Sequence, residues 1–131
     1  MNEEKFNAGA VWHGPWHTGL AAGSFGAPGN YHWAMALGQH TLKSSVQKKE
    51  KAFFPFTSKK HGSAKTVLIL QPGTAPFGDK TRTSYLLAFR LVARKTDLER
   101  RFKFCTRISD ELYQEAVHNY QKILSARKRH K

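Results

Sequence analysis

The clearest alternation of hydrophobic and polar positions lies between residues 83 and 108. Large apolar side chains recur at every second residue from Thr83 to Arg94, and phenylalanine alternates with basic residues from Glu99 to Ile108. Alternation with a period of two is typical of strands that bury one face. The four residues between the two runs suit a hairpin connection, and pairing Arg94 with Glu99 brings the apolar sides together. The pattern therefore predicts a hairpin with a phenylalanine face and a basic face.

The basic face of this predicted hairpin collects cations from both strands. It holds Arg90, Arg94, Arg101, Lys103 and Arg107. Such a cluster on neighbouring strands is typical of a phosphate-binding surface. The alternative is a solvated sheet face that keeps the protein in solution, in which case acidic residues should be interspersed.

An amphipathic helix is predicted to follow the hairpin. Ser109 is a candidate N-cap, and the acidic residues Asp110 and Glu111 suit the positive end of the helix dipole. From residue 112 to 124, apolar side chains recur at helical spacing, so this stripe is expected to pack on the phenylalanine face. The helix leads into a basic tail whose candidate phosphate-binding residues are Arg127, Lys128 and Arg129.

The earlier part of the chain contains shorter apolar runs. Residues 31–37 and 66–70 read as strands, the second buried on both faces, and residues 40–46 could return from the first as a hairpin partner. Pro55 interrupts an aromatic cluster and argues against a central strand there. Residues 6–30 are rich in glycine and contain two tryptophans, but they show no sustained period.

Together these elements predict an α+β fold. An antiparallel sheet of four to five strands would be packed by one C-terminal amphipathic helix. Residues 1–30 would form a Gly/Trp-rich N-terminal arm and residues 31–131 a single basic domain. The chain of 131 residues, with 40% hydrophobic content, is long enough for one ordinary core and excludes a fully disordered chain.

The charge of the chain is strongly positive and unevenly placed. The formal net charge is +13, whereas the first 42 residues carry only Glu3, Glu4 and Lys5, a net of −1. An excess of this size repels itself unless an anionic partner offsets it. We therefore expect a nucleic acid, RNA favoured over DNA, within a larger assembly such as a ribonucleoprotein or a viral particle. A self-assembling coat protein is a further alternative.

Residues 43–65 contribute seven lysines against one glutamate and read as a second phosphate-contacting loop, or equally as a solvated one. The candidates chosen in this segment are Lys48, Lys49, Lys59 and Lys60. The neighbouring Phe53, Phe54 and Phe56 either stack on bases or belong to the core.

An enzyme is the alternative of a different class. Histidine together with lysine and arginine can cleave RNA by general acid–base chemistry without a metal, and the first candidates are His17, His32 and His40. A single cysteine and few carboxylates give no zinc pattern, so no metal or cofactor is expected.

The segment from 31 to 38, YHWAMALG, resembles the histidine box of lecithin-retinol-acyltransferase-like thiol enzymes. The resemblance implies His32 as the base and Cys105 as the nucleophile of a thiol acyltransferase or hydrolase. The Asn-Cys pair of that family is absent because Cys105 follows Phe104, and Cys105 alternates within a strand pattern. An unreactive strand cysteine is the other interpretation.

One candidate targeting feature is the basic tail at residues 127–131, which could be a nuclear import signal as well as a phosphate clamp. Cys105 is the only cysteine, so no intrachain disulfide forms, and no apolar run reaches the length of a membrane span. The first residues lack the basic-then-apolar order of a signal peptide. We therefore expect an intracellular protein, in the cytoplasm or nucleus, or one within a viral particle, and not a secreted one.

Overall fold

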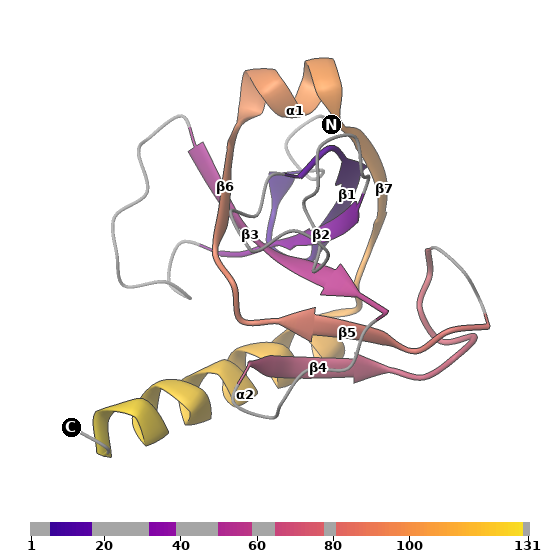
Figure 1. Ribbon diagram of the computed structural model, residues 1–131. Coiled ribbons are helices and arrows are strands. Elements are labelled where there is room, and N and C mark those ends of the chain that lie inside the picture. The colour runs from indigo at the N-terminus through magenta and orange to yellow at the C-terminus, as the bar shows by residue number, and fades with distance from the viewer. Residues whose placement is uncertain (1–5, 17–31, 39–49, 59–64, 78–80, 130–131) are drawn as a thin grey trace.

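The computed structural model describes residues 6–16, 32–38, 50–58, 65–77 and 81–129, with side chains described up to Arg127 in the last helix (Figure 1). Seven strands and two helices lie in these ranges. They are β1 Ala10–Gly14, β2 His32–Ala36, β3 Glu50–Thr57, β4 Thr66–Leu70, β5 Ser84–Leu87, β6 Leu91–Arg94, α1 Lys95–Arg101, β7 Lys103–Arg107 and α2 Asp110–Arg129. The described strand pairs are antiparallel. The α+β class with an antiparallel sheet is confirmed, whereas the predicted count of four to five strands is too low.

Strand β3 is the centre of the sheet because it pairs with β2 along one edge and with both β6 and β5 along the other. The strand order is β4-β5-β3-β2-β1-β7, and β6 joins β3 off this path. Phe54 and Phe56 belong to a first core cluster, and Phe53 belongs to a second. Because successive residues of a strand point to opposite faces, β3 supplies aromatic side chains to two layers.

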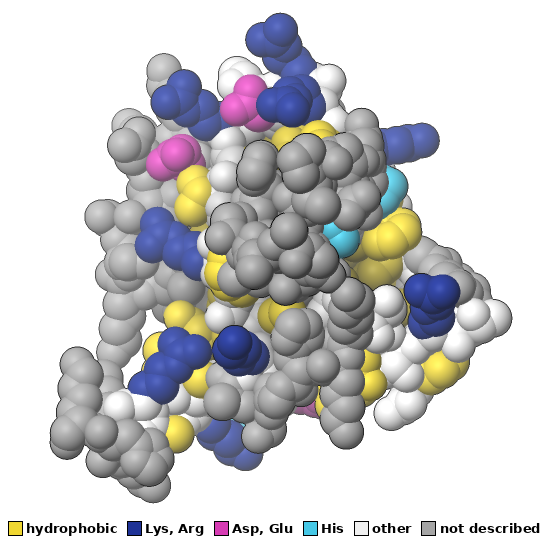
Figure 2. Space-filling model, in the orientation of Figure 1, with side chains coloured by type: hydrophobic (Ala, Val, Ile, Leu, Met, Phe, Trp, Pro, Cys, Tyr) yellow, Lys and Arg dark blue, Asp and Glu magenta, His cyan; other side chains and the backbone are white. Residues whose placement is uncertain are grey.

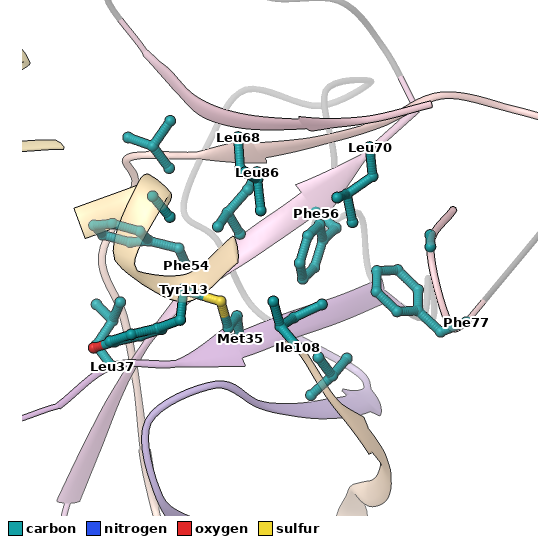
Figure 3. Close-up of a cluster of buried hydrophobic side chains, with 14 of the residues drawn as sticks. Met35, Leu37, Phe54, Phe56, Leu68, Leu70, Phe77, Leu86, Ile108 and Tyr113 are labelled. Carbon is teal, nitrogen blue, oxygen red and sulfur yellow. The ribbon is translucent and has the colours of Figure 1, made fainter. Parts of the chain in front are cut away.

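The first core cluster lies between the sheet and α2. Figure 3 shows its side chains converging from several strands and from the helix, among them Met35, Phe54, Leu68, Leu86 and Tyr113. At the start of α2, the backbone N–H of Leu112 donates a hydrogen bond of 3.3 Å to Ser109 Oγ, as an N-cap does. The helix also supports the sheet edge, because the Asn119 side chain donates to the Val67 carbonyl at 2.8 Å.

The second core cluster lies under α1. Trp12 and Trp16 are 2% and 3% exposed, and the Trp16 indole N–H donates to the Trp12 carbonyl at 3.1 Å. Leu98 of α1 is fully buried in the same cluster as these tryptophans and Phe53. Gly14 lies where an added Cβ would collide with the ring of Phe102, so the end of β1 needs a residue without a side chain.

The predicted hairpin is wrong. Residues 83–94 form two strands, β5 and β6, which are separated by residues 88–90. The predicted turn is the start of helix α1, so β6 pairs with β3 while β7 pairs with β1. Three strands, β3, β2 and β1, therefore lie between β6 and β7 in the sheet, and Figure 1 shows α1 joining β6 to β7 above them. Burial of Leu98 stabilises the helix in place of the turn.

Three expectations for the earlier chain also need correction. Residues 10–14 of the predicted arm form β1, a strand between β2 and β7, although residues 1–5 and 17–30 lie outside the described ranges. Pro55 lies in the central strand β3. Strand β4 is at the end of the sheet path and exposes 51% of Ile69, so it is not buried on both faces. The predicted strand at 31–37 is present as β2, and the predicted return at 40–46 lies outside the described residues.

Candidate nucleic-acid interface

The five cations of the predicted basic face are all exposed, but they do not share one face of adjacent strands. Arg90 follows β5, Arg94 ends β6, and Arg101 ends α1. Lys103 and Arg107 are the first and last residues of β7. Since three strands separate β6 from β7, the prediction of a single basic sheet face is wrong.

A different basic region is formed by the end of β6, α1 and β7, here called the α1–β7 basic surface. Its six cations are Arg94, Lys95, Arg100, Arg101, Lys103 and Arg107, and its two carboxylates are Asp97 and Glu99, which gives a net charge of +4. Every one of these cations is exposed except Lys95, which is half-buried. Figure 2 shows Lys and Arg side chains gathered over the position of α1, interrupted by acidic ones. The surface is therefore cationic and open to solvent.

Two of these cations are held in place by described contacts. Lys95 Nζ lies 5.4 Å from the centre of the Phe6 ring, a cation–π contact. Arg107 Nη2 donates a hydrogen bond of 3.0 Å to the carbonyl of Ala8. The first contact fixes a positive charge beside Phe6 of the second core cluster, and the second fixes one beside Ala8, which packs against the first core cluster.

A bulge in β7 decides which side chains share a face. Along β1, Trp12 pairs with Phe104 and the preceding Val11 pairs with Thr106, so Cys105 is the extra residue. Residues that pair across antiparallel strands point to the same face. Arg107, opposite Ala10, therefore shares the face of Phe104, whereas Lys103, opposite His13, lies on the other face. Simple alternation would have placed Phe104 and Arg107 on opposite faces.

Phe104 is an exposed aromatic residue in the middle of this surface. Its side chain is 36% exposed, and its ring meets the Trp12 ring edge to face at 5.8 Å. Trp12 in turn stacks on Phe6 at 5.4 Å. The exposed ring of Phe104 therefore packs against the buried ring of Trp12, which in turn packs against Phe6.

The C-terminal basic tail lies apart from the α1–β7 basic surface. Helix α2 begins just after β7 and leads away from α1, so the last turn of α2 and α1 are at opposite ends of the molecule in Figure 1. Arg127 is exposed near the end of α2. The side chains of Lys128 and Arg129 lie outside the described part, as do Lys48, Lys49, Lys59 and Lys60.

The aromatic cluster of β3 does not offer a stacking surface. Phe53, Phe54 and Phe56 are between 0% and 4% exposed, and all three belong to the two core clusters. Of the two interpretations of these rings, the structure supports the core.

The described histidines include one neighbouring pair on β1 and β2. The ring of His13 stacks on Trp33 at 4.2 Å, and His32 lies opposite Gly14. Burial lowers the pKa of His13, and the pKa of His32 is lowered by burial and by the positive charge of His13. Strand alternation places His13 on the face of Trp33 and His32 on the face of Gly14, yet the charge of His13 reaches His32, so the two rings are close neighbours. The other candidates, His17 and His40, lie outside the described residues.

Cys105 and His32 are not brought together as a catalytic pair. Cys105 is exposed on β7, and its thiol donates to the Lys103 carbonyl at 3.6 Å. Strand β1 lies between β7 and β2, which places the two backbones about 10 Å apart from the spacing of strands alone. Among the described residues, no group of three or more His, Cys, Asp or Glu side chains is arranged to hold a metal ion.

The sequence prediction missed Lys95, Arg100 and the exposure of Phe104. The signal for Arg100 was present, because α1 carries Asp97 in its first turn and Arg100 and Arg101 in its last, as the helix dipole favours. Lys95 begins the helix, where the dipole disfavours a cation, so this signal does not identify it. The exposure of Phe104 follows from its place on an edge strand, which the alternation alone does not specify.

Comparison of the chain with protein-family models, with curated proteins and with solved structures found no match. Among the described helices, none combines the length and the apolar character needed to cross a membrane.

Proposed function

We propose that the protein binds nucleic acid, RNA rather than DNA, through phosphate contacts. The observation that supports this most directly is the α1–β7 basic surface, where five of six cations are exposed and outnumber the nearby carboxylates Asp97, Glu99 and Glu50, the last of which lies opposite Arg94. Cations that neutralise phosphates release condensed counterions, and this release is the main source of sequence-independent affinity. Arg127, Lys128 and Arg129 would add a second contact region at the end of α2.

The formal net charge of +13 also favours an anionic partner. A surplus of positive charge destabilises a compact chain by self-repulsion, and a polyanion removes that cost when it binds. We place the protein inside a larger assembly, a ribonucleoprotein or a viral particle, because such assemblies supply the polyanion continuously. A purely solvated surface is the competing explanation, and only a binding measurement distinguishes the two.

The test is the salt dependence of RNA binding, measured by fluorescence anisotropy with a labelled single-stranded RNA. We expect the logarithm of the affinity to fall linearly with the logarithm of salt concentration. Replacing Arg101 and Lys103 by glutamine should weaken binding and reduce the slope by about 1.4, since each phosphate contact on a single strand contributes about 0.7.

A matched control removes the same charge elsewhere. Arg82 and Lys122 are exposed outside the α1–β7 basic surface, so their replacement by glutamine lowers the net charge equally without changing that surface. Equal weakening by both double variants would contradict a localised interface. Absence of binding at low salt would contradict the proposed function itself. The same RNA, incubated with protein in a chelator and then sized, would reveal cleavage if the protein were instead a metal-free ribonuclease.

A further inference from the structure

We infer that Phe104 is a stacking platform for one unpaired base of single-stranded RNA, with flanking cations that bind the adjacent phosphates. This inference rests on the proposed function and specifies it further. It concerns the strand β7, its bulge and the end of α1. The site would accept single-stranded RNA in preference to duplex RNA, a choice that the overall charge of the protein does not determine.

The bulge at Cys105 places an aromatic ring and a cation side by side. Because of the register shift, Phe104 and Arg107 share one face of the sheet although they are three residues apart. Arg107 is anchored by its 3.0 Å hydrogen bond to the Ala8 carbonyl, so its guanidinium stays near the sheet edge. Lys103 precedes the ring along the strand and projects to the other face. An RNA strand that crosses the sheet edge at Phe104 would therefore meet Arg107 on the face of the ring and Lys103 on the opposite face of the sheet.

Phe104 differs from the other large exposed hydrophobic residues. In the described part of the chain these are Ile69, Val92 and Phe104, of which only Phe104 is aromatic. Aromatic rings stack on every base because every base has a π face, whereas aliphatic side chains lack one. The ring is also preorganised, since the buried Trp12 contacts it edge to face at 5.8 Å. Little side-chain freedom would be lost when a base stacks on it.

The position of the ring selects single strands over duplexes. In a duplex both faces of each internal base are covered by its neighbours, so an exposed ring on a sheet edge has no free base to contact. In a single strand the bases can turn outward and stack on protein aromatics. We commit to RNA because unpaired bases are the usual target of proteins that recognise RNA.

The test compares Phe104 variants on single-stranded RNA of about 12 nucleotides and on a blunt RNA duplex of the same sequence. Phe104→Ala should weaken single-strand binding by about 5-fold to about 160-fold, the range typical for loss of one stacked base, and leave duplex binding unchanged. Phe104→Leu keeps an apolar contact with Trp12 but loses the π face, so it should weaken binding as well. Phe104→Trp should restore it. Thermal melting of each variant checks that the fold is intact.

Val92→Ala is the matched control, because Val92 is 40% exposed and lies on β6, away from β7. It should leave both affinities unchanged. If Phe104→Ala or Phe104→Leu binds single-stranded RNA as tightly as the parent protein, the stacking inference is wrong and the proposed function stands. If the parent protein binds neither form of RNA, the proposed function is wrong. Single-stranded DNA of the same sequence forms a further arm, and a tighter complex with DNA than with RNA would overturn the choice of RNA.

Discussion

His13 occupies a position where its protonation affects the fold. Its ring stacks on Trp33 at 4.2 Å, and His32 lies on the neighbouring strand. Burial lowers the pKa of both histidines below the ordinary value of 6.5, and the positive charge of His13 lowers the pKa of His32 further. In the folded protein both imidazoles are therefore neutral near pH 7.

The free energy of unfolding should consequently fall in mild acid. A histidine whose pKa is lower in the folded state binds more protons when the chain unfolds, so stability is fully present above pH 6.5 and is lost as the pH falls below that value. We predict that His13→Gln reduces this loss, because one titrating group disappears and the pKa of His32 rises. Urea unfolding at about pH 7.5 and about pH 5 measures the effect. The parent protein, unfolded at the same two pH values, is the reference, and an equal loss of stability in the parent and in His13→Gln would contradict this prediction.

At the scale of elements, the period-two patterns located the strands but not their partners. Alternation in residues 83–94 and 99–108 agrees with β5, β6 and β7, yet consecutive strands do not pair here. The partners come from β3 and β1, which are earlier in the chain. Local periodicity records which residues are buried and contains no information on which distant strand covers an edge, so the hairpin was predicted wrongly.

Pro55 shows how a local rule can fail inside a sheet. It pairs with Ala34 of β2, and on the other side of β3 it falls between the residues paired to β6 and those paired to β5. The Leu37 N–H donates a hydrogen bond to the Ala52 carbonyl, so the backbone polar groups of Ala52 point toward β2. Because these groups alternate in direction along a strand, the backbone nitrogen of Pro55 points to the other side of β3, toward that gap. A missing N–H costs little where no strand accepts it, so proline is tolerated in a central strand.

The candidate site was predictable in its charges and not in its geometry. Arg101, Lys103 and Arg107 were identified because basic residues are visible in any sequence. The bulge at Cys105, which moves Arg107 to the face of Phe104, depends on the register with β1. That register is a contact between residues about 95 positions apart, and no pattern within either strand specifies it.

Helix α1 gives a test that separates the observed fold from the predicted hairpin. Leu98 is fully buried in the second core cluster, so Leu98→Ala should destabilise the protein by about 2–5 kcal/mol through lost burial and the remaining cavity. In a hairpin turn the same residue would be exposed and the change nearly neutral. Thr96→Ala, at an exposed position of the same helix, is the control. Urea unfolding curves measure the stability of both variants, and equal midpoints for the two would contradict the burial of Leu98.

At the scale of the whole molecule, positive charge lies in two separate regions. The α1–β7 basic surface is at one end, and Arg127, near the end of α2, is at the other (Figure 1). Helix α2 has 20 residues and is therefore about 30 Å long. At physiological salt the Debye length is about 8 Å, so a short RNA bound at one region would hardly sense the other. The two regions should act together only on an RNA that reaches both.

RNA length should therefore decide how much the tail contributes. Deleting residues 127–131 should leave the affinity for an RNA of about 4 nucleotides nearly unchanged, because at about 3.4 Å per nucleotide it is no longer than the five-residue strand β7 and cannot span the length of α2, about 30 Å. For an RNA of about 40 nucleotides the same deletion should weaken binding by about 10-fold or more, since the second contact then forms at a high effective concentration. Anisotropy titrations at about 0.15 M salt measure both affinities. Equal weakening for the two lengths would mean that the tail and α1–β7 contact the same short segment, which the arrangement of α2 does not allow for a rigid molecule.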